Sequence, residues 1–224
     1  MYKISSANYI YALLGIDLGG AEKMFWDNVA GVYDIFVKVI NKKAHNKLRG
    51  IVGKYIEPHD KVLECAAGTG MLSEVIADRC ESLVATDFAP KMIKRAEKNC
   101  SEHDNITFAL ADITALDYPD NSFDKVIAGN VIHLLDDPTK ALAELNRVCK
   151  PGGILIIPTY MNRDKKGKNT TFTDSVGKAG ADFKHYFNVA SYLEFFKIAG
   201  YADVKVELAD GRIPCAVATM RKKI

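Results

Sequence analysis

The sequence predicts an α/β fold with a doubly wound, mostly parallel seven-stranded sheet and a C-terminal antiparallel hairpin. Between residues 61 and 159, short apolar segments alternate with segments of helical period, which is typical of parallel strands joined by right-handed crossovers. A glycine turn follows the first strand, as it does in many nucleotide-binding units. Two more apolar segments flank the turn "DGRIP", which indicates the hairpin.

The chain divides into an expected helical cap at residues 1–57 and a main domain at residues 58–224. Within the cap, apolar residues recur at spacings of four, three and four, which places them on one helical face. These residues are Phe25, Val29, Val32 and Phe36. Residues 160–187 interrupt the main domain with a polar, glycine-bearing segment. A connection this long is more often functional than a plain loop, so we interpret it as a lid over the substrate.

The core elements are expected in a regular order. Strands are predicted at residues 61–65, 82–87, 106–111, 123–129 and 153–159. Helices are predicted at about 70–79, 90–100, 137–149 and 189–199. Since the carboxyl ends of parallel strands meet at one edge of a sheet, the loops that follow these strands should form one rim, where ligands bind in such folds.

Composition excludes several classes of protein. The net charge is only +2, which argues against a dedicated nucleic-acid surface. Five cysteines without a C-x-x-C pair suggest reduced thiols in the cytoplasm, and five histidines without ligand spacing suggest no structural metal. The apolar run at residues 9–16 is shorter than the roughly 20 residues that a membrane span requires, and no signal peptide is evident.

Polar residues at the strand ends indicate an adenosine site. Gly68 and Gly70 form the turn after the first strand, where glycine allows a close approach of the backbone. Asp87 ends the second strand, where a carboxylate can accept hydrogen bonds from both ribose hydroxyls. Asp112 follows the third strand and could accept from an adenine amino group. The order of these signals, each at a strand end, is more specific than any of them alone.

The cofactor must suit a loop that departs from the phosphate-binding patterns. The chain has no Gly-Lys-Ser/Thr of a P-loop, and Ser73 stands where a dinucleotide loop has its third glycine. Glu64, at the end of the first strand, would repel a pyrophosphate but could hold a cationic amino acid tail. These features favour a zwitterionic, sulfonium-bearing ligand and disfavour a nicotinamide-dependent dehydrogenase, which stays an alternative.

The segment "VLECAAGTG" resembles the first motif of the class I S-adenosylmethionine-dependent methyltransferases, and "ATDFAPKMIKRAEKN" resembles their second. The stretch from "LADITALDYPD" to "VCKPGGILII" is similar to their third to fifth strands. Within the class, the chain is most similar to the small-molecule group that includes ubiquinone/menaquinone and phospholipid methyltransferases. The resemblance covers about residues 25–160 and implies S-adenosyl-L-methionine as cofactor.

The resemblance also implies site residues. Ala66 takes the place of the first loop glycine, and alanine suits this position only if its φ is negative. The segment Ala66, Ala67, Gly68, Thr69 and Gly70 would pass beneath the cofactor, and Phe88 and Ile113 would flank its adenine. The other implied cofactor contacts are Tyr33, Glu64, Met92, Asp87, Asp112, Asn130 and His133. Tyr33, Met92 and His133 could equally be packing residues.

The implied function is methyl transfer to a small-molecule acceptor, which the apolar N-terminal segment suggests is hydrophobic. If the acceptor must lose a proton, the candidate groups are His133, His185 and Tyr186. The sequence leaves open the identity of the acceptor, the atom that is methylated, and the oligomeric state. A protein that binds S-adenosylmethionine without catalysis remains a further alternative.

Overall fold

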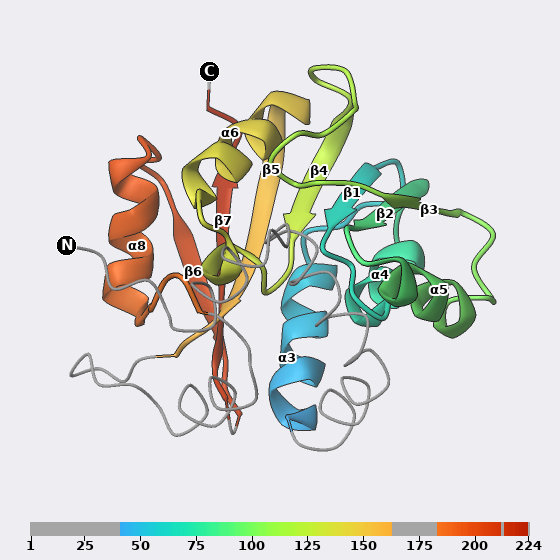
Figure 1. Ribbon diagram of the computed structural model, residues 1–224, viewed down its shortest axis with the longest axis horizontal. Coiled ribbons are helices and arrows are strands. Elements are labelled where there is room, and N and C mark those ends of the chain that lie inside the picture. Colours follow the sequence, from blue (N-terminus) through green and yellow to red (C-terminus); the bar gives the residue numbers. More distant parts are fainter. Residues whose placement is uncertain (1–40, 163–182, 212, 224) are drawn as a thin grey trace, which may run out of the picture.

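The computed structural model describes residues 41–162, 183–211 and 213–223 (Figure 1). Tyr33, the apolar face predicted around residues 25–36, and most of the predicted lid lie outside the described residues. Of the predicted helical cap, the described part contains helix α3 (Lys42–Gly53). No helix in the described part of the chain is long and apolar enough to cross a membrane.

The seven strands form one sheet in the order β3-β2-β1-β4-β5-β7-β6 (Figure 1). Their bounds are β1 Lys61–Cys65, β2 Ser82–Asp87, β3 Ile106–Leu110, β4 Phe123–Ala128, β5 Cys149–Tyr160, β6 Lys205–Ala209 and β7 Cys215–Arg221. Strands β1 to β5 pair in parallel, whereas β7 pairs antiparallel with both β5 and β6. This arrangement confirms the predicted doubly wound sheet with an antiparallel hairpin.

Helices cover both faces of the sheet, and each face has its own apolar core. Helices α3 and α4 (Met71–Ala77) pack on one face, where Leu48 and Ile76 are buried against the strands. Helices α6 (Pro138–Val148) and α8 (Val189–Ile198) pack on the other, where Leu145 and Phe196 are buried. Helix α5 (Pro90–Asn99) lies beside β2 and β3, and the 3-10 helix η2 (Ile132–Leu134) follows β4.

Local sequence explains where these helices begin. Proline occupies the first turn of both α5 and α6, where its missing N–H needs no partner. Asp137 caps α6 by accepting from the Lys140 amide, and Asn188 and Ser191 form a reciprocal capping box on α8. The largest difference from the predicted elements is β5, which begins at Cys149 rather than Gly153 because its first residues pair with β4 before a register shift.

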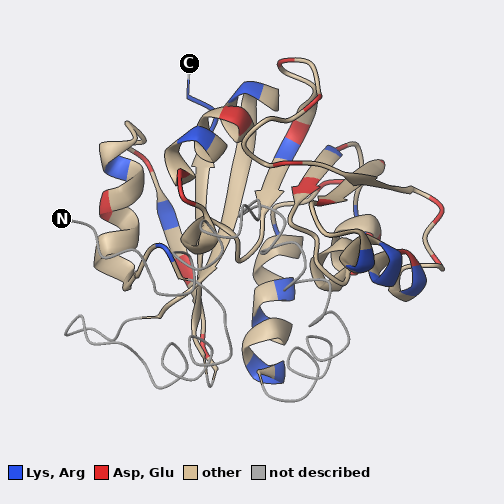
Figure 2. Ribbon diagram, viewed as in Figure 1, with Lys and Arg blue, Asp and Glu red and all other residues tan. Residues whose placement is uncertain are grey.

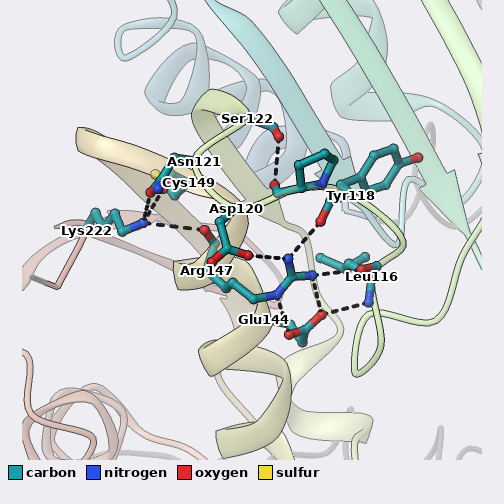
Figure 3. A network of polar contacts seen from close by, with 10 residues as sticks. Leu116, Tyr118, Asp120, Asn121, Ser122, Glu144, Arg147, Cys149 and Lys222 are labelled. Atoms are coloured by element: carbon teal, nitrogen blue, oxygen red, sulfur yellow. Dashed lines mark hydrogen bonds and ion pairs between the residues drawn. The ribbon is translucent and has the colours of Figure 1, made fainter.

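The connection between β3 and β4 is fixed by Arg147 of α6 (Figure 3). Its guanidinium donates to the carbonyl oxygens of Leu116 and Tyr118, at 2.8 and 2.7 Å, and to the Asp120 carboxylate at 2.8 Å. The Glu144 carboxylate accepts from Arg147 and from the Leu116 amide. These contacts hold the loop before β4 against α6, which in turn fixes where β4 enters the sheet.

Opposite charges are paired at the amino ends of the parallel strands. The Lys125 ammonium lies 2.7 Å from the Asp60 carboxylate, and both side chains are at most 10% exposed. The Lys150 ammonium lies 2.8 Å from the Asp124 carboxylate. Figure 2 shows the acidic and basic segments side by side where β4 begins. The charges at the amino ends of these strands are therefore paired with each other and contribute to the stability of the fold.

Candidate functional site

A pocket opens at the carboxyl ends of β1, β2 and β4, where the order of the strands reverses. This is where ligands bind in doubly wound sheets, because the crossovers on either side of the reversal leave a crevice. Its lining is Glu64, Ala66, Ala67, Gly68, Thr69, Met71, Leu72, Asp87, Phe88, Met92, Gly129, Asn130, Val131 and Leu134.

The loop between β1 and α4 has an unusual backbone. Ala66, Gly68 and Gly70 have φ of 56°, 57° and 90°, all in the left-handed region. The expectation that alanine would adopt a negative φ at position 66 is therefore wrong. A left-handed turn is needed here to carry the chain from β1 into α4, and the Ala67 amide then donates to the Thr86 carbonyl at 2.9 Å. Position 66 thus bears a methyl group in a conformation that favours glycine.

Gly70 is required by packing as well as by its dihedral angle. A β-carbon at this position would lie 2.7 Å from the Cys100 sulfur. Gly70 is the N-cap of α4, and the Cys100 thiol lies 3.6 Å from its carbonyl oxygen. The Asn99 side chain donates to the Thr69 carbonyl at 2.8 Å. Helix α5 therefore supports the loop from behind and leaves its other side toward the pocket.

Asp87 is held in place at the end of β2. One carboxylate oxygen accepts from the Gly68 amide at 2.9 Å, and the other accepts from the Ala89 amide at 3.0 Å. The residue is 6% exposed and lines the pocket. Carboxylates in hydrogen-bond networks of this kind have few rotamers left, so Asp87 presents a fixed acceptor to a ligand.

Glu64 is a buried acid beside the loop. It is 1% exposed, and the Ser73 hydroxyl donates to its carboxylate at 2.6 Å. The pKa of Glu64 is raised to about 8, mainly by burial and less by the negative charge of Asp87, while the hydrogen bond from Ser73 opposes the rise. A ligand with a positive charge near this carboxyl group would favour the ionised form.

Most of the predicted cofactor residues lie together around this pocket. They are Glu64, Ala66, Ala67, Gly68, Thr69, Asp87, Phe88, Met92 and Asn130. Asp112 and Ile113 lie beside β3 and are absent from the lining. The Asp112 carboxylate accepts from the amide and the hydroxyl of Thr114, each at 2.8 Å, and Ile113 is buried in the core around α6.

Sequence reasoning missed five lining residues. They are Met71, Leu72, Gly129, Val131 and Leu134. Gly129 and Val131 flank the predicted Asn130, so the end of β4 was the available signal. Met71 directly follows Gly70, so its place next to the glycine loop was the available signal. Leu134 faces the pocket from η2, which the sequence did not predict as an element.

The residues predicted to contact the methyl acceptor lie beside the pocket rather than in its lining. His133, in η2, is 3% exposed, and its ring stacks on Phe183 with centroids 5.3 Å apart. Its backbone oxygen accepts from the amides of Lys184 and His185, at 3.1 and 3.0 Å. Tyr186 packs its ring 6.2 Å from Phe183. The structure therefore brings the three predicted side chains to one side of η2.

The imidazole of His133 is unsuited to take up a proton. Burial, together with a smaller effect of the neighbouring His185, lowers its pKa to about 3. The Nδ1 atom of His133 and the Nε2 atom of His185 are buried without a hydrogen-bond partner among the described residues. Buried polar atoms without partners are uncommon in native proteins and often mark a functional position.

The pocket fits an adenosine ligand with an amino acid tail. The glycine loop allows a close approach of the backbone, Asp87 offers a fixed double acceptor, and Glu64 offers an acid for a cationic group. None of the described residues that line the pocket is a lysine or an arginine, and the Glu64 carboxyl group would oppose the negative charge of a pyrophosphate. Apolar side chains such as Phe88 and Met92 supply surface for a flat ring.

Comparison with known families agrees with this geometry. Residues 63–157 match the family model of a methyltransferase domain. The chain is 35% identical over 156 residues to a demethylmenaquinone methyltransferase of Renibacterium salmoninarum, covering 69% of this chain and 65% of that protein. It is 36% identical over 137 residues to a ubiquinone/menaquinone biosynthesis C-methyltransferase of Bdellovibrio bacteriovorus, covering 59% and 58%. The matches span less than two thirds of each relative's length.

Solved structures share the fold at low sequence identity. A methyltransferase of Thermotoga maritima, described as a possible histamine N-methyltransferase, aligns with a TM-score of 0.69 and 19% identity, covering 89% of this chain and 98% of that one. A Haloferax volcanii putative methyltransferase, solved with the Trm112 activator, aligns with a TM-score of 0.72 and 18% identity, covering 89% and 98%. The matched domain and the relatives are those of methyltransferases, and the solved structures share the fold, so the chain is similar to the class I S-adenosylmethionine-dependent methyltransferases.

Proposed function

We propose that the chain transfers a methyl group from S-adenosyl-L-methionine to a small-molecule acceptor. The observation that carries this proposal is the pocket at the reversal of strand order, where Glu64, Asp87 and the glycine loop lie together and no described lining residue is basic. A dehydrogenase would require a site for pyrophosphate, which this lining disfavours. The chain matches only part of each relative's length, so its substrates are also part of the proposal.

Each residue of the pocket has a role in this proposal. Asp87 accepts from the ribose hydroxyls, and the loop at Gly68 and Gly70 admits the amino acid tail beside Glu64. Phe88 and Met92 contact the adenine, which Asp112 and Ile113 approach from the end of β3. Tyr33, outside the described residues, would close the site from the cap. When bound, the cofactor supplies a methyl group that is already activated on a sulfonium, so the chain mainly orients the acceptor.

Orientation can contribute much of the rate. Holding two reactants in an in-line geometry is worth about 7–11 kcal/mol of the barrier, and exclusion of water protects the reacting groups. Asn130 at the end of β4 and the residues around η2 adjoin the pocket, so they are placed to orient an acceptor. With a pKa of about 3, His133 would act as a neutral hydrogen-bonding group rather than as a base.

We infer that the acceptor is hydrophobic and carries a ring. Phe183, Phe187 and Tyr160 surround His133 and His185, and they provide apolar, flat surfaces. The names of the relatives, which act in demethylmenaquinone and ubiquinone/menaquinone methylation, support the same class. His133, His185 and Tyr186 would contact this acceptor.

The cellular setting follows the same reasoning. We infer a cytoplasmic enzyme that does not bind nucleic acid, because the net charge is only +2 and the five cysteines are unpaired. We also infer that residues 1–57 act as a cap on the domain at residues 58–224, with residues 160–187 as a lid that selects the acceptor.

Calorimetry with S-adenosylhomocysteine and NAD in parallel tests the cofactor. We expect micromolar binding of S-adenosylhomocysteine and none of NAD, and the reverse result would refute the proposal. Turnover is then measured with radiolabelled S-adenosylmethionine against quinols, phenols, amines, thiols and phospholipids. Binding of the cofactor without turnover on any acceptor would support a non-catalytic binding protein instead.

A further inference from the structure

Asn162, directly after β5, occupies a position that the reaction scheme above does not use. It is fully buried, and its side chain makes two hydrogen bonds across a gap of more than twenty residues in the sequence. The amide nitrogen donates to the His185 carbonyl at 3.0 Å, and the amide oxygen accepts from the Phe187 amide at 2.5 Å. One side chain therefore fixes the backbone on both sides of Tyr186.

The same segment is also bonded to η2. The amides of Lys184 and His185 both donate to the His133 carbonyl. The Phe183 ring stacks on the His133 ring, and the His185 ring stacks on the Phe187 ring with centroids 6.2 Å apart. Residues 183–187 are thus held from η2 on one side and from the end of β5 on the other.

This double attachment places two histidines next to each other. The ring atoms Nδ1 of His133 and Nε2 of His185 are both buried without a hydrogen-bond partner among the described residues. A neutral imidazole has one donor and one acceptor nitrogen, so each ring keeps one hydrogen-bonding position for a ligand. Leu134, directly after His133, and Val131, two residues before it, line the cofactor pocket, so such a ligand would lie beside the methyl donor.

We propose that Asn162 is a positioning residue for the methyl acceptor, because it locks residues 185–187 so that His133 and His185 jointly hydrogen-bond an oxygen of the acceptor. This inference rests on the proposed function and adds to it a residue that touches neither cofactor nor acceptor. The low pKa of His133 keeps its ring neutral, which leaves it one donor and one acceptor nitrogen.

The test uses ¹⁵N spectra of the histidine rings in the full chain loaded with S-adenosylhomocysteine. The probe is 1-naphthol, which carries one hydroxyl group on an apolar ring, and the control ligand is naphthalene, which has the same ring without the hydroxyl. We expect 1-naphthol to shift the ring nitrogens of both His133 and His185, and naphthalene to shift neither.

The variant is Asn162→Ala, and its matched control is Asn188→Ala. Asn188 directly follows the same segment, and its side chain caps α8 by accepting from the Ser191 amide, so its loss should lower stability. We expect the control to keep both ring shifts. Asn162→Ala should lose the His185 shift and raise the KM for the acceptor at least tenfold, with the affinity for S-adenosylhomocysteine unchanged within twofold.

Several results would overturn the inference. They are ring shifts in Asn162→Ala equal to those of the wild type, 1-naphthol bound without any ring shift, or no binding of 1-naphthol at all. If Asn162→Ala does not fold, His185→Phe replaces it, and an undiminished His133 shift there would also overturn the inference. Failure of the wild type to bind S-adenosylhomocysteine would instead refute the proposed function, so the two failures are distinguishable.

Discussion

Charged side chains are arranged differently at the amino ends and at the carboxyl ends of the parallel strands, which we call the amino edge and the carboxyl edge of the sheet. At the amino edge, each buried charge has an opposite partner, as in the Lys125–Asp60 pair at 2.7 Å. At the carboxyl edge, Glu64 and Asp87 line the same pocket, and none of the lining residues in the described part of the chain is basic. The charged groups at the amino edge are paired within the fold, whereas the acidic groups at the carboxyl edge can still hydrogen-bond a ligand.

The largest expected effect comes from removing a buried ion pair at the amino edge. Replacing Lys125 with Met leaves the Asp60 carboxylate buried without its partner, which typically costs about 3–5 kcal/mol. We expect the free energy of unfolding in urea to fall by that amount, while the affinity for S-adenosylhomocysteine stays within twofold in the folded protein. Lys47→Ala, which removes an exposed ion pair with Asp210, is the control and should cost under about 0.5 kcal/mol.

The second largest effect comes from removing an acidic side chain that lines the pocket at the carboxyl edge. Asp87→Ala removes the fixed acceptor for the ribose hydroxyls, and hydrogen bonds to charged groups are worth about 1.5–3 kcal/mol each. We expect the affinity for S-adenosylhomocysteine to fall roughly 100-fold by calorimetry. Asp136→Ala, which changes an exposed carboxylate near η2, should leave the affinity unchanged. Equal affinity in Asp87→Ala and the wild type would show that the ribose lies elsewhere.

The third effect concerns pH. Burial raises the pKa of Glu64 from 4.5 to about 8, so between these values the folded state holds a proton that the unfolded state has lost. Stability from this group is therefore present below pH 4.5 and is lost as pH rises toward 8, by about 1.4 kcal/mol per pH unit at the steepest.

Glu64→Gln isolates this contribution. The difference in unfolding free energy between the wild type and Glu64→Gln should change in the variant's favour from pH 5.5 to pH 8. The opposite dependence, which the lowered pKa of His133 produces in acid, is present in both proteins and cancels. A difference that does not vary with pH would mean that Glu64 is ionised throughout.

The smallest effect concerns the loop between β1 and α4 at the carboxyl edge. Ala66 has φ of 56°, and a left-handed conformation costs a non-glycine residue about 1–2 kcal/mol. Glycine would remove this strain but add unfolded-state entropy, so we expect Ala66→Gly to stabilise the chain by about 0.5–1 kcal/mol. Thermal unfolding checks this expectation, and a loss of stability would show that the alanine methyl group makes a compensating contact.

Most of the pocket residues at the carboxyl edge could be predicted from the sequence, because ligand-binding residues in such sheets lie at the carboxyl ends of the strands. Each lies at or just after the carboxyl end of a strand, and parallel strands place such residues along one rim. These residues are Glu64, Gly68, Asp87 and Asn130. The bounds of β1 and β2 were predicted to the residue, since short apolar segments between turns define them.

Features that depend on distant contacts could not be predicted. The φ of Ala66 follows from how β1 turns into α4, and alanine itself favours the opposite sign. The role of Asn162 depends on contacts with His185 and Phe187, and no periodicity reveals such pairs. Arg147 anchors the loop before β4 through contacts with residues about thirty positions earlier in the chain, which no local pattern indicates (Figure 3).

Strand β7 has a consequence for how this sheet can be assembled during synthesis. It follows every other strand in the chain, yet it lies between β5 and β6 and is buried along nearly its whole length. Until β7 emerges from the ribosome, one side of β5 has no partner, and β6 has no place in the sheet. An unpaired strand edge of this kind invites aggregation. We therefore expect the nascent chain to depend on chaperones until its last strand has been made.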